Sequence, residues 1–131
     1  MNKNRLLLLT LIVGFSFLLI FSSAGLAQTR FGLAISTLNN PFFVTLRDGA
    51  QMKSDELGVE LIIVDAQNDA SRQLNSIEDM IVRQIDILMV NPVDAEAIVT
   101  AIESANQAGI PVITVDRGAS GGEVVSHIAS D

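Results

Sequence analysis

Short apolar runs in this chain are each followed directly by polar or aromatic side chains. These clusters are Ser36 to Phe43, Asp65 to Asn68, Asn91, Asp116-Arg117 and Ser130-Asp131. Together they supply amides, carboxylates, one guanidinium and two adjacent phenyl rings. A neutral polyol suits such a set, because its hydroxyls both donate and accept hydrogen bonds while its C–H faces pack on aromatic rings. The predicted chemistry is therefore the reversible binding of a sugar.

These groups can act together only if the chain brings the ends of the apolar runs to one place. The runs begin near Phe31, Val59, Ile85 and Val112, which spaces them by about 27 residues. Helical patterns separate them, and such alternation indicates parallel strands that are covered on both faces. We therefore predict an α/β fold, a three-layer α/β/α sandwich with a parallel sheet. Ligands bind such sheets outside the carboxyl ends of the strands.

The strand boundaries follow from the extent of each apolar run. We predict strands over Phe31 to Ser36, Val59 to Val64, Ile85 to Val90, Val112 to Val115 and Val124 to Ala129. No helix is expected between the last two strands, because the intervening segment is a glycine-rich loop.

Capping residues predict three helices between the first four strands. The first begins at Pro41 with Asn40 as its N-cap and ends before Gly58. Asp69 or Ser71 can cap the second helix, and Asp94 is expected to cap the third. The side chains expected to face inward are Phe43, Leu46, Ala50 and Leu57, then Leu74, Ile77, Ile81 and Val82, then Ile98, Ala101, Ile102 and Ala105.

The first 27 residues have the order of a secretory signal peptide. A basic start at Met1 to Arg5 precedes an apolar run at Leu6 to Phe21 and then small residues. We expect cleavage after Ala27, with Ala24 as the less favoured position, so that the mature chain is 28–131. An uncleaved membrane anchor is the alternative, although the apolar run is shorter than the roughly 20 residues that span a bilayer.

Charge and composition exclude several classes of function. Without Lys3 and Arg5, the chain has six basic and 15 acidic residues. The resulting net charge of −9 disfavours nucleic acid as a partner. The chain has no cysteine for a disulfide, a thiolate zinc site or a lipid anchor. No phosphate-binding glycine motif occurs, and we predict neither a cofactor nor a metal site. Asp65 lacks the acidic pair that a receiver or phosphatase would place after the first strand, and His127 is a lone histidine.

Four separated blocks of the sequence resemble the periplasmic ribose-binding proteins of ABC transporters. The blocks are residues 36–43, the Asn91-Pro92 turn with Asp94, residues 111–117 and residues 126–131. The resemblance implies a type I periplasmic-binding-protein lobe, in which the first lobe's share of the ribose site consists of Ser36, Asn40, Phe42, Phe43, Asp116, Arg117 and Ser130. It also implies that Phe42 and Phe43 are the stacking pair.

The resemblance further implies a receptor without enzymatic activity. It would capture ribose or a closely related monosaccharide in the periplasm and deliver it to an ABC permease, with a chemotaxis receptor as a further partner. That family has two lobes, and Asp131 matches the start of the first crossing between them, so the chain is expected to carry an incomplete N-terminal lobe and half of a site. The alternatives are an exported sensing or interaction module of the same fold and an α/β enzyme domain.

Four of the seven assigned residues also have a structural interpretation. Asn40 can serve only as a helix cap, and Phe43 fits the helical core spacing. Asp116 can be a plain loop residue and Arg117 a solvated one.

Overall fold

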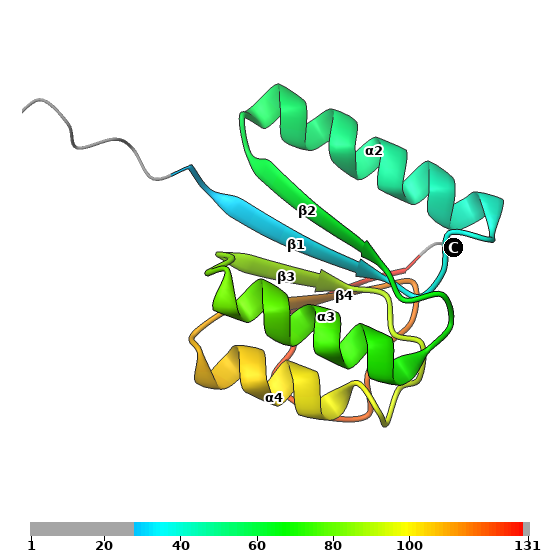
Figure 1. Cartoon of the computed structure of the whole chain (residues 1–131), viewed down its shortest axis with the longest axis vertical. Coiled ribbons are helices and arrows are strands. Elements are labelled where there is room, and N and C mark those ends of the chain that lie inside the picture. Colours follow the sequence, from blue (N-terminus) through cyan, green and yellow to red (C-terminus); the bar gives the residue numbers. More distant parts are fainter. Residues whose placement is uncertain (1–27, 130–131) are drawn as a thin grey trace, which may run out of the picture.

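The computed structural model describes residues 28–129, in which one parallel sheet carries helices on both faces (Figure 1). In chain order the elements are β1 (Arg30–Ile35), α2 (Pro41–Leu57), β2 (Glu60–Asp65), α3 (Ala70–Val82), β3 (Ile87–Val90), α4 (Val99–Gln107), β4 (Val112–Val115) and β5 (Ser126–Ile128). The signal peptide predicted at 1–27 and the predicted site residue Ser130 lie outside the described residues. Within residues 28–129 no helix is both long enough and apolar enough to cross a membrane.

The strand order is β2-β1-β3-β4-β5, and every neighbouring pair is parallel. Helix α2 covers one face of the sheet, whereas α3 and α4 cover the other (Figure 1). This arrangement confirms the predicted three-layer sandwich. Because all strands run the same way, the segments that contain Asn40, Asn91 and Asp116 leave the sheet at one common edge, as predicted.

The apolar core lies on both sides of the sheet, and alternation along β1 divides it. Leu33 and Ile35 pack with Phe43 beneath α2, whereas Ala34 belongs to the larger cluster under α3 and α4. Gly32 allows α3 to lie close to β1, since a Cβ atom there would be 2.8 Å from the sulfur of Met80. A larger residue at that position would force the side chains of Met80 and Ile85 to move.

Local sequence signals set both ends of α2 and the start of α3. The side chain of Asn40 accepts a hydrogen bond from the backbone N–H of Phe42, and Gly58 ends α2 in the left-handed conformation with φ of 68°. Of the two caps considered for α3, Asp69 performs the role by accepting from the N–H of Arg72 at 2.9 Å. The two N-caps fix where the loops that follow β1 and β2 end.

The predicted N-cap of α4 was wrong. The helix begins at Val99, with Ile98 at the cap position and no side-chain cap bond. Asp94 instead accepts from the N–H groups of Glu96 and Ala97 and so closes the preceding turn. This turn is irregular, because the N–H of Ile98 bonds to the carbonyl four residues back at Asp94, whereas the N–H of Val99 bonds to the carbonyl three residues back at Glu96, each at 3.2 Å.

Two of the side chains predicted to face inward are exposed. Leu57 and Val82 are 60% and 79% exposed, and each is the last residue of its helix, where the chain already turns toward the next strand. The bounds of β4 match the prediction, and those of the other strands differ from it by one or two residues at an end. The larger changes are a later start of β3, at Ile87, and a shorter β5, whose three residues are all exposed.

Candidate functional site

The loops after β1 and β2 are tied together by one carboxylate. Oδ1 of Asp65 accepts from the backbone N–H of Leu38 at 3.2 Å and from that of Gln67 at 2.9 Å. Gln67 and Asn68 both adopt positive φ, which lets the chain turn sharply before α3. Asp65 therefore has a structural role that holds the β1–α2 loop at the end of β2.

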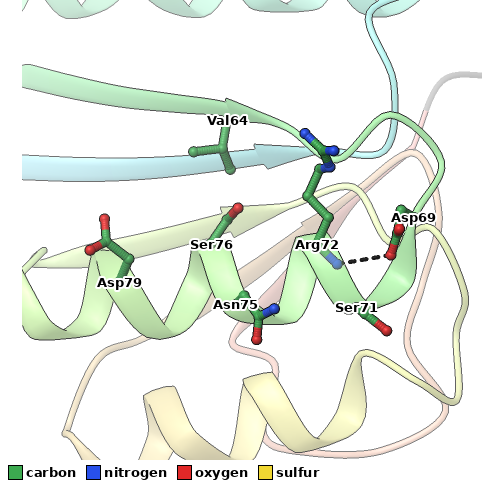
Figure 2. Close-up of a pocket in the computed structure, with 7 residues that line it drawn as sticks. All are labelled: Val64, Asp69, Ser71, Arg72, Asn75, Ser76 and Asp79. Atoms are coloured by element: carbon green, nitrogen blue, oxygen red, sulfur yellow. Dashed lines mark hydrogen bonds between the residues drawn. The ribbon is translucent and has the colours of Figure 1, made fainter.

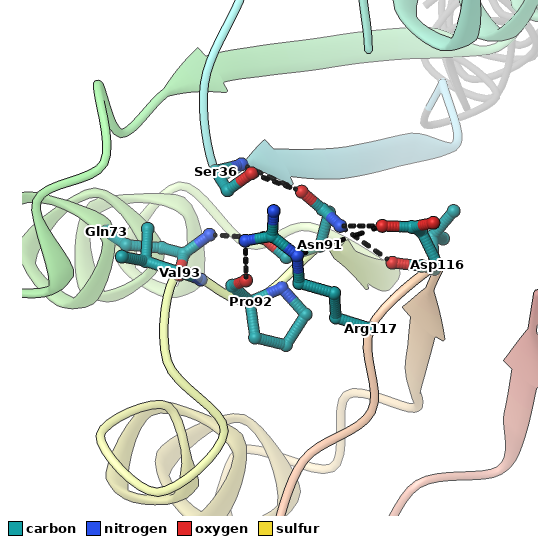
Figure 3. Close-up of polar contacts among 8 residues, drawn as sticks. Ser36, Gln73, Asn91, Pro92, Val93, Asp116 and Arg117 are labelled. Carbon is teal, nitrogen blue, oxygen red and sulfur yellow. Dashed lines mark hydrogen bonds and ion pairs between the residues drawn. The ribbon is translucent and has the colours of Figure 1, made fainter. Parts of the chain in front are cut away.

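A buried hydrogen-bond chain joins the ends of β1, β3 and β4 (Figure 3). The N–H and the hydroxyl of Ser36 both donate to Oδ1 of Asn91, at 3.2 and 2.5 Å. Nδ2 of Asn91 donates to the carbonyl of Val115 at 3.0 Å and to Oδ2 of Asp116 at 3.4 Å. An asparagine amide has two donor hydrogens and two acceptor lone pairs. Asn91 uses all of them inside the protein.

Asp116 occupies a tight turn at the end of β4. Its φ is 64°, and the N–H of Arg117 donates back to the carbonyl of Val115 at 2.7 Å, which closes a three-residue turn around Asp116. Turns of this kind with positive φ are rare and strained, and aspartate tolerates them better than most residues. The N–H of Asp116 donates to the carbonyl of Ile128 on β5 at 2.7 Å. The turn thus presents the Asp116 carboxylate at the sheet edge with a fixed backbone.

Arg117 connects the end of β4 to the turn after β3 and to the start of α2. Its Nη1 donates to the carbonyl of Pro92 at 3.3 Å, and its Nε lies 3.8 Å from Oδ2 of Asp116. The guanidinium carbon is 5.6 Å from the centroid of the Phe43 ring, within the range of a cation–π contact. The Arg117 side chain remains about half exposed, so it can also reach a ligand.

The structure brings together all of the predicted site residues that it describes, but it places them in two layers. Ser36 and Phe43 are buried, at 0% and 2% exposed. Phe42 is 45% exposed, and its ring meets the Phe43 ring edge to face at 5.3 Å. Asn40 and Arg117 are exposed, and the Asp116 side chain is 28% exposed. The outer layer can therefore contact a ligand, while the inner layer supports it.

Sequence reasoning did not assign two residues that shape this edge. Asn91 was recognised as a strand-end residue but was not included among the seven site residues. Gln73 lies on the inward face of α3, four residues before Ile77, and is 1% exposed. Its spacing from Ile77 and Met80 was the available signal, because a polar residue on a helix's apolar face usually has buried hydrogen-bond partners.

An open groove lies away from these residues, along α3 beside the edge strand β2 (Figure 2). It measures about 560 Å³ and is lined by Val64, Asp69, Ser71, Arg72, Asn75, Ser76 and Asp79. None of the predicted site residues contributes to it. Within residues 28–129, no three acidic or histidine side chains are grouped as metal ligands.

Comparisons with known proteins agree on one family. A family described as "Periplasmic binding protein domain" matches residues 31–131. The chain is 57% identical to the ribose import binding protein RbsB of Haemophilus influenzae, over 84% of this chain and 38% of that protein. It is 48% identical to RbsB of Escherichia coli, over 100% of this chain and 44% of that protein. The crystal structure of a Caulobacter myo-inositol binding protein, with myo-inositol bound, superposes with a TM-score of 0.74 and 30% identity, over 82% of this chain and 38% of that one.

Proposed function

The chain belongs to the periplasmic binding protein domain family, and we propose that the edge formed by Asn40, Phe42, Asp116 and Arg117 is one lobe's half of a ribose site. The observation that carries this proposal is the contiguous set of an exposed phenyl ring, a carboxylate and a guanidinium at the carboxyl end of a parallel sheet. Ribose, rather than another polyol, is favoured by the names of the two bacterial relatives at 48% and 57% identity.

The chemistry of the outer layer matches a monosaccharide. The Asp116 carboxylate can accept from two adjacent hydroxyls, and the Arg117 guanidinium can donate to ring or hydroxyl oxygens. The side-chain oxygen of Asn40 is used as the helix cap, while its amide nitrogen has no hydrogen-bond partner among residues 28–129 and can donate to a sugar. The Phe42 ring offers an apolar face for the C–H groups of the sugar.

The chain spans 38–44% of the length of these two relatives. We propose that the remainder of such a protein supplies a second lobe, which closes over this edge and excludes water from the sugar. On this proposal the protein acts in the periplasm after removal of residues 1–27 and delivers its sugar to an ABC permease. The chemotaxis receptor that the resemblance implies is supported by none of these observations and is not part of the proposal. The same holds for the sensing module and for an enzymatic role.

The test is a chimera in which this chain replaces the matching first part of the Escherichia coli relative, to which it aligns over its full length. Isothermal titration calorimetry with D-ribose is expected to show micromolar or tighter binding, and myo-inositol is expected to bind much more weakly. The 131-residue chain alone is expected to bind ribose very weakly, because a second set of hydrogen-bond partners is absent and water is not excluded. A folded chimera that gives no heat with ribose would refute the proposal.

A further inference from the structure

Gln73 is a buried polar residue that does not reach the ligand edge. It lies in the first turn of α3 and is 1% exposed. Its Nε2 donates to the backbone carbonyl of Asn91 at 2.8 Å and to that of Ala34 at 3.4 Å, and its Oε1 accepts from the N–H of Val93 at 2.9 Å. The side-chain amide thus uses both donor hydrogens and its acceptor, all on backbone groups.

These backbone groups lie where β3 leaves the sheet. The N–H of Asn91 still pairs with the carbonyl of Ala34 on β1, but the next residue is Pro92, which has no N–H to continue the ladder. The carbonyl of Asn91 and the N–H of Val93 have no backbone partner among residues 28–129. The side-chain amide of Gln73 bonds to both of these groups, one before and one after Pro92, as the peptide group of a neighbouring strand would.

The turn held in this way supports both charged residues of the proposed site (Figure 3). The carbonyl of Pro92 accepts from Nη1 of Arg117, and the side chain of Asn91 donates to Oδ2 of Asp116. A change in the direction of the peptides flanking Pro92 would move the acceptor of Arg117 and the donor to Asp116 together.

We propose that Gln73 is a positioning residue for the sugar site, acting through the Asn91–Val93 turn on Arg117 and Asp116. This inference rests on the proposed function, because its consequence is a loss of sugar affinity. An apolar side chain of equal length in its place leaves a buried carbonyl and a buried N–H without partners. Buried backbone groups rarely tolerate this state, so the turn would shift to reach water.

The test compares Gln73→Met with Ile77→Val in the chimera described above. Ile77 is 0% exposed and lies on the same face of α3, four residues after Gln73. Its side chain makes no hydrogen bond to the Asn91–Val93 turn. At a temperature where both variants are folded, Gln73→Met is expected to weaken ribose binding about tenfold or more, while Ile77→Val stays within about twofold. Equal losses in the two variants would overturn the positioning role.

A double-mutant cycle separates positioning from general destabilisation. If Gln73 acts through Arg117, then Gln73→Met should cost much less ribose affinity in an Arg117→Ala background than in the wild-type background. Additive losses would contradict the proposal. If Gln73→Met does not fold, Gln73→Asn, which keeps the amide one methylene short of its partners, takes its place in the same cycle.

A readout without sugar distinguishes failure of this inference from failure of the proposed function. The hydrogen bond from Nη1 to Pro92 slows rotation of the Arg117 guanidinium, which nuclear magnetic resonance measures in the unliganded protein. Gln73→Met is expected to speed this rotation, and Ile77→Val is not. If the chimera binds no ribose but the rotation responds in this way, the sugar proposal fails and the positioning role stands. Unchanged rotation in Gln73→Met overturns the positioning role itself.

Discussion

Asp116→Ala is the substitution that most directly tests the site, because it removes the one carboxylate of the outer layer. In the unliganded protein that carboxylate has few interactions to lose. It accepts a hydrogen bond of 3.4 Å from Nδ2 of Asn91, which also donates to the carbonyl of Val115. It lies 3.8 Å from Nε of the half-exposed Arg117. A pair this open to solvent contributes less than about 1 kcal/mol to the free energy of unfolding.

The magnitudes for stability and for binding should therefore differ. Alanine in a left-handed turn with φ of 64° costs about 1–2 kcal/mol, which dominates the expected loss of folding stability. A hydrogen bond to a charged group contributes about 1.5–3 kcal/mol, so losing two sugar hydroxyl bonds costs about 3–6 kcal/mol. That loss raises the Kd for ribose by roughly two to four orders of magnitude.

The assay combines calorimetry with denaturant unfolding on the ribose-binding chimera. Asp116→Asn is the matched control, because asparagine tolerates the left-handed turn and keeps one acceptor oxygen while losing the charge. It should unfold like the wild type within about 0.5 kcal/mol and bind ribose with an intermediate affinity. Wild-type affinity in Asp116→Ala would remove Asp116 from the site and refute the reasoning from its geometry.

Three further predictions concern the phenyl rings of Phe42 and Phe43, the predicted signal peptide and the edge strand β5. Phe42→Ala should weaken ribose binding about fivefold with little change in the free energy of unfolding. Phe43→Ala should lower the free energy of unfolding by about 3–5 kcal/mol, because only Phe43 is buried. Equal unfolding curves for the two variants would contradict this. N-terminal sequencing of exported protein should begin at Gln28, and an intact Met1 leader would contradict the predicted cleavage. Sedimentation velocity should show that the chain self-associates with rising concentration through the edge strand β5, because Ile128 on this strand and Val125 just before it are more than half exposed. A monodisperse monomer at high concentration would be evidence against this.

The fold could be predicted where a local signal determined the structure. Asn40, Pro41 and Gly58 fix both ends of α2 through bonds and torsion angles within a few residues of themselves. The start of α4 could not be predicted in this way. The side chain of Asp94 can cap a separate turn or an α-helix with the same hydrogen bonds, so its presence does not show that the regular helix begins only at Val99.

Side-chain burial and the layering of the site depend on contacts that no local pattern contains. Helical spacing placed Leu57 on an apolar stripe, but spacing alone does not show that this last residue of α2 is 60% exposed, because exposure depends on what packs against it. The sequence indicated correctly that Ser36 and Asp116 come to the same edge. It did not indicate that Asn91 lies between them, because that contact requires the ends of β1, β3 and β4 to be placed side by side.

The two layers of the edge bear on how a sugar is recognised. Behind the outer layer, the hydroxyl of Ser36 and the amide groups of Gln73 and Asn91 already donate to acceptors within the protein, so none of these donors can bind a ligand without first losing a bond. A sugar therefore meets the outer layer, whose Asp116 and Arg117 are already held in place. Side chains ordered before binding lose little further entropy when the ligand arrives, and this favours affinity. Substitutions of Ser36, Gln73 or Asn91 should thus lower folding stability and sugar affinity together, whereas those in the outer layer should act mainly on affinity.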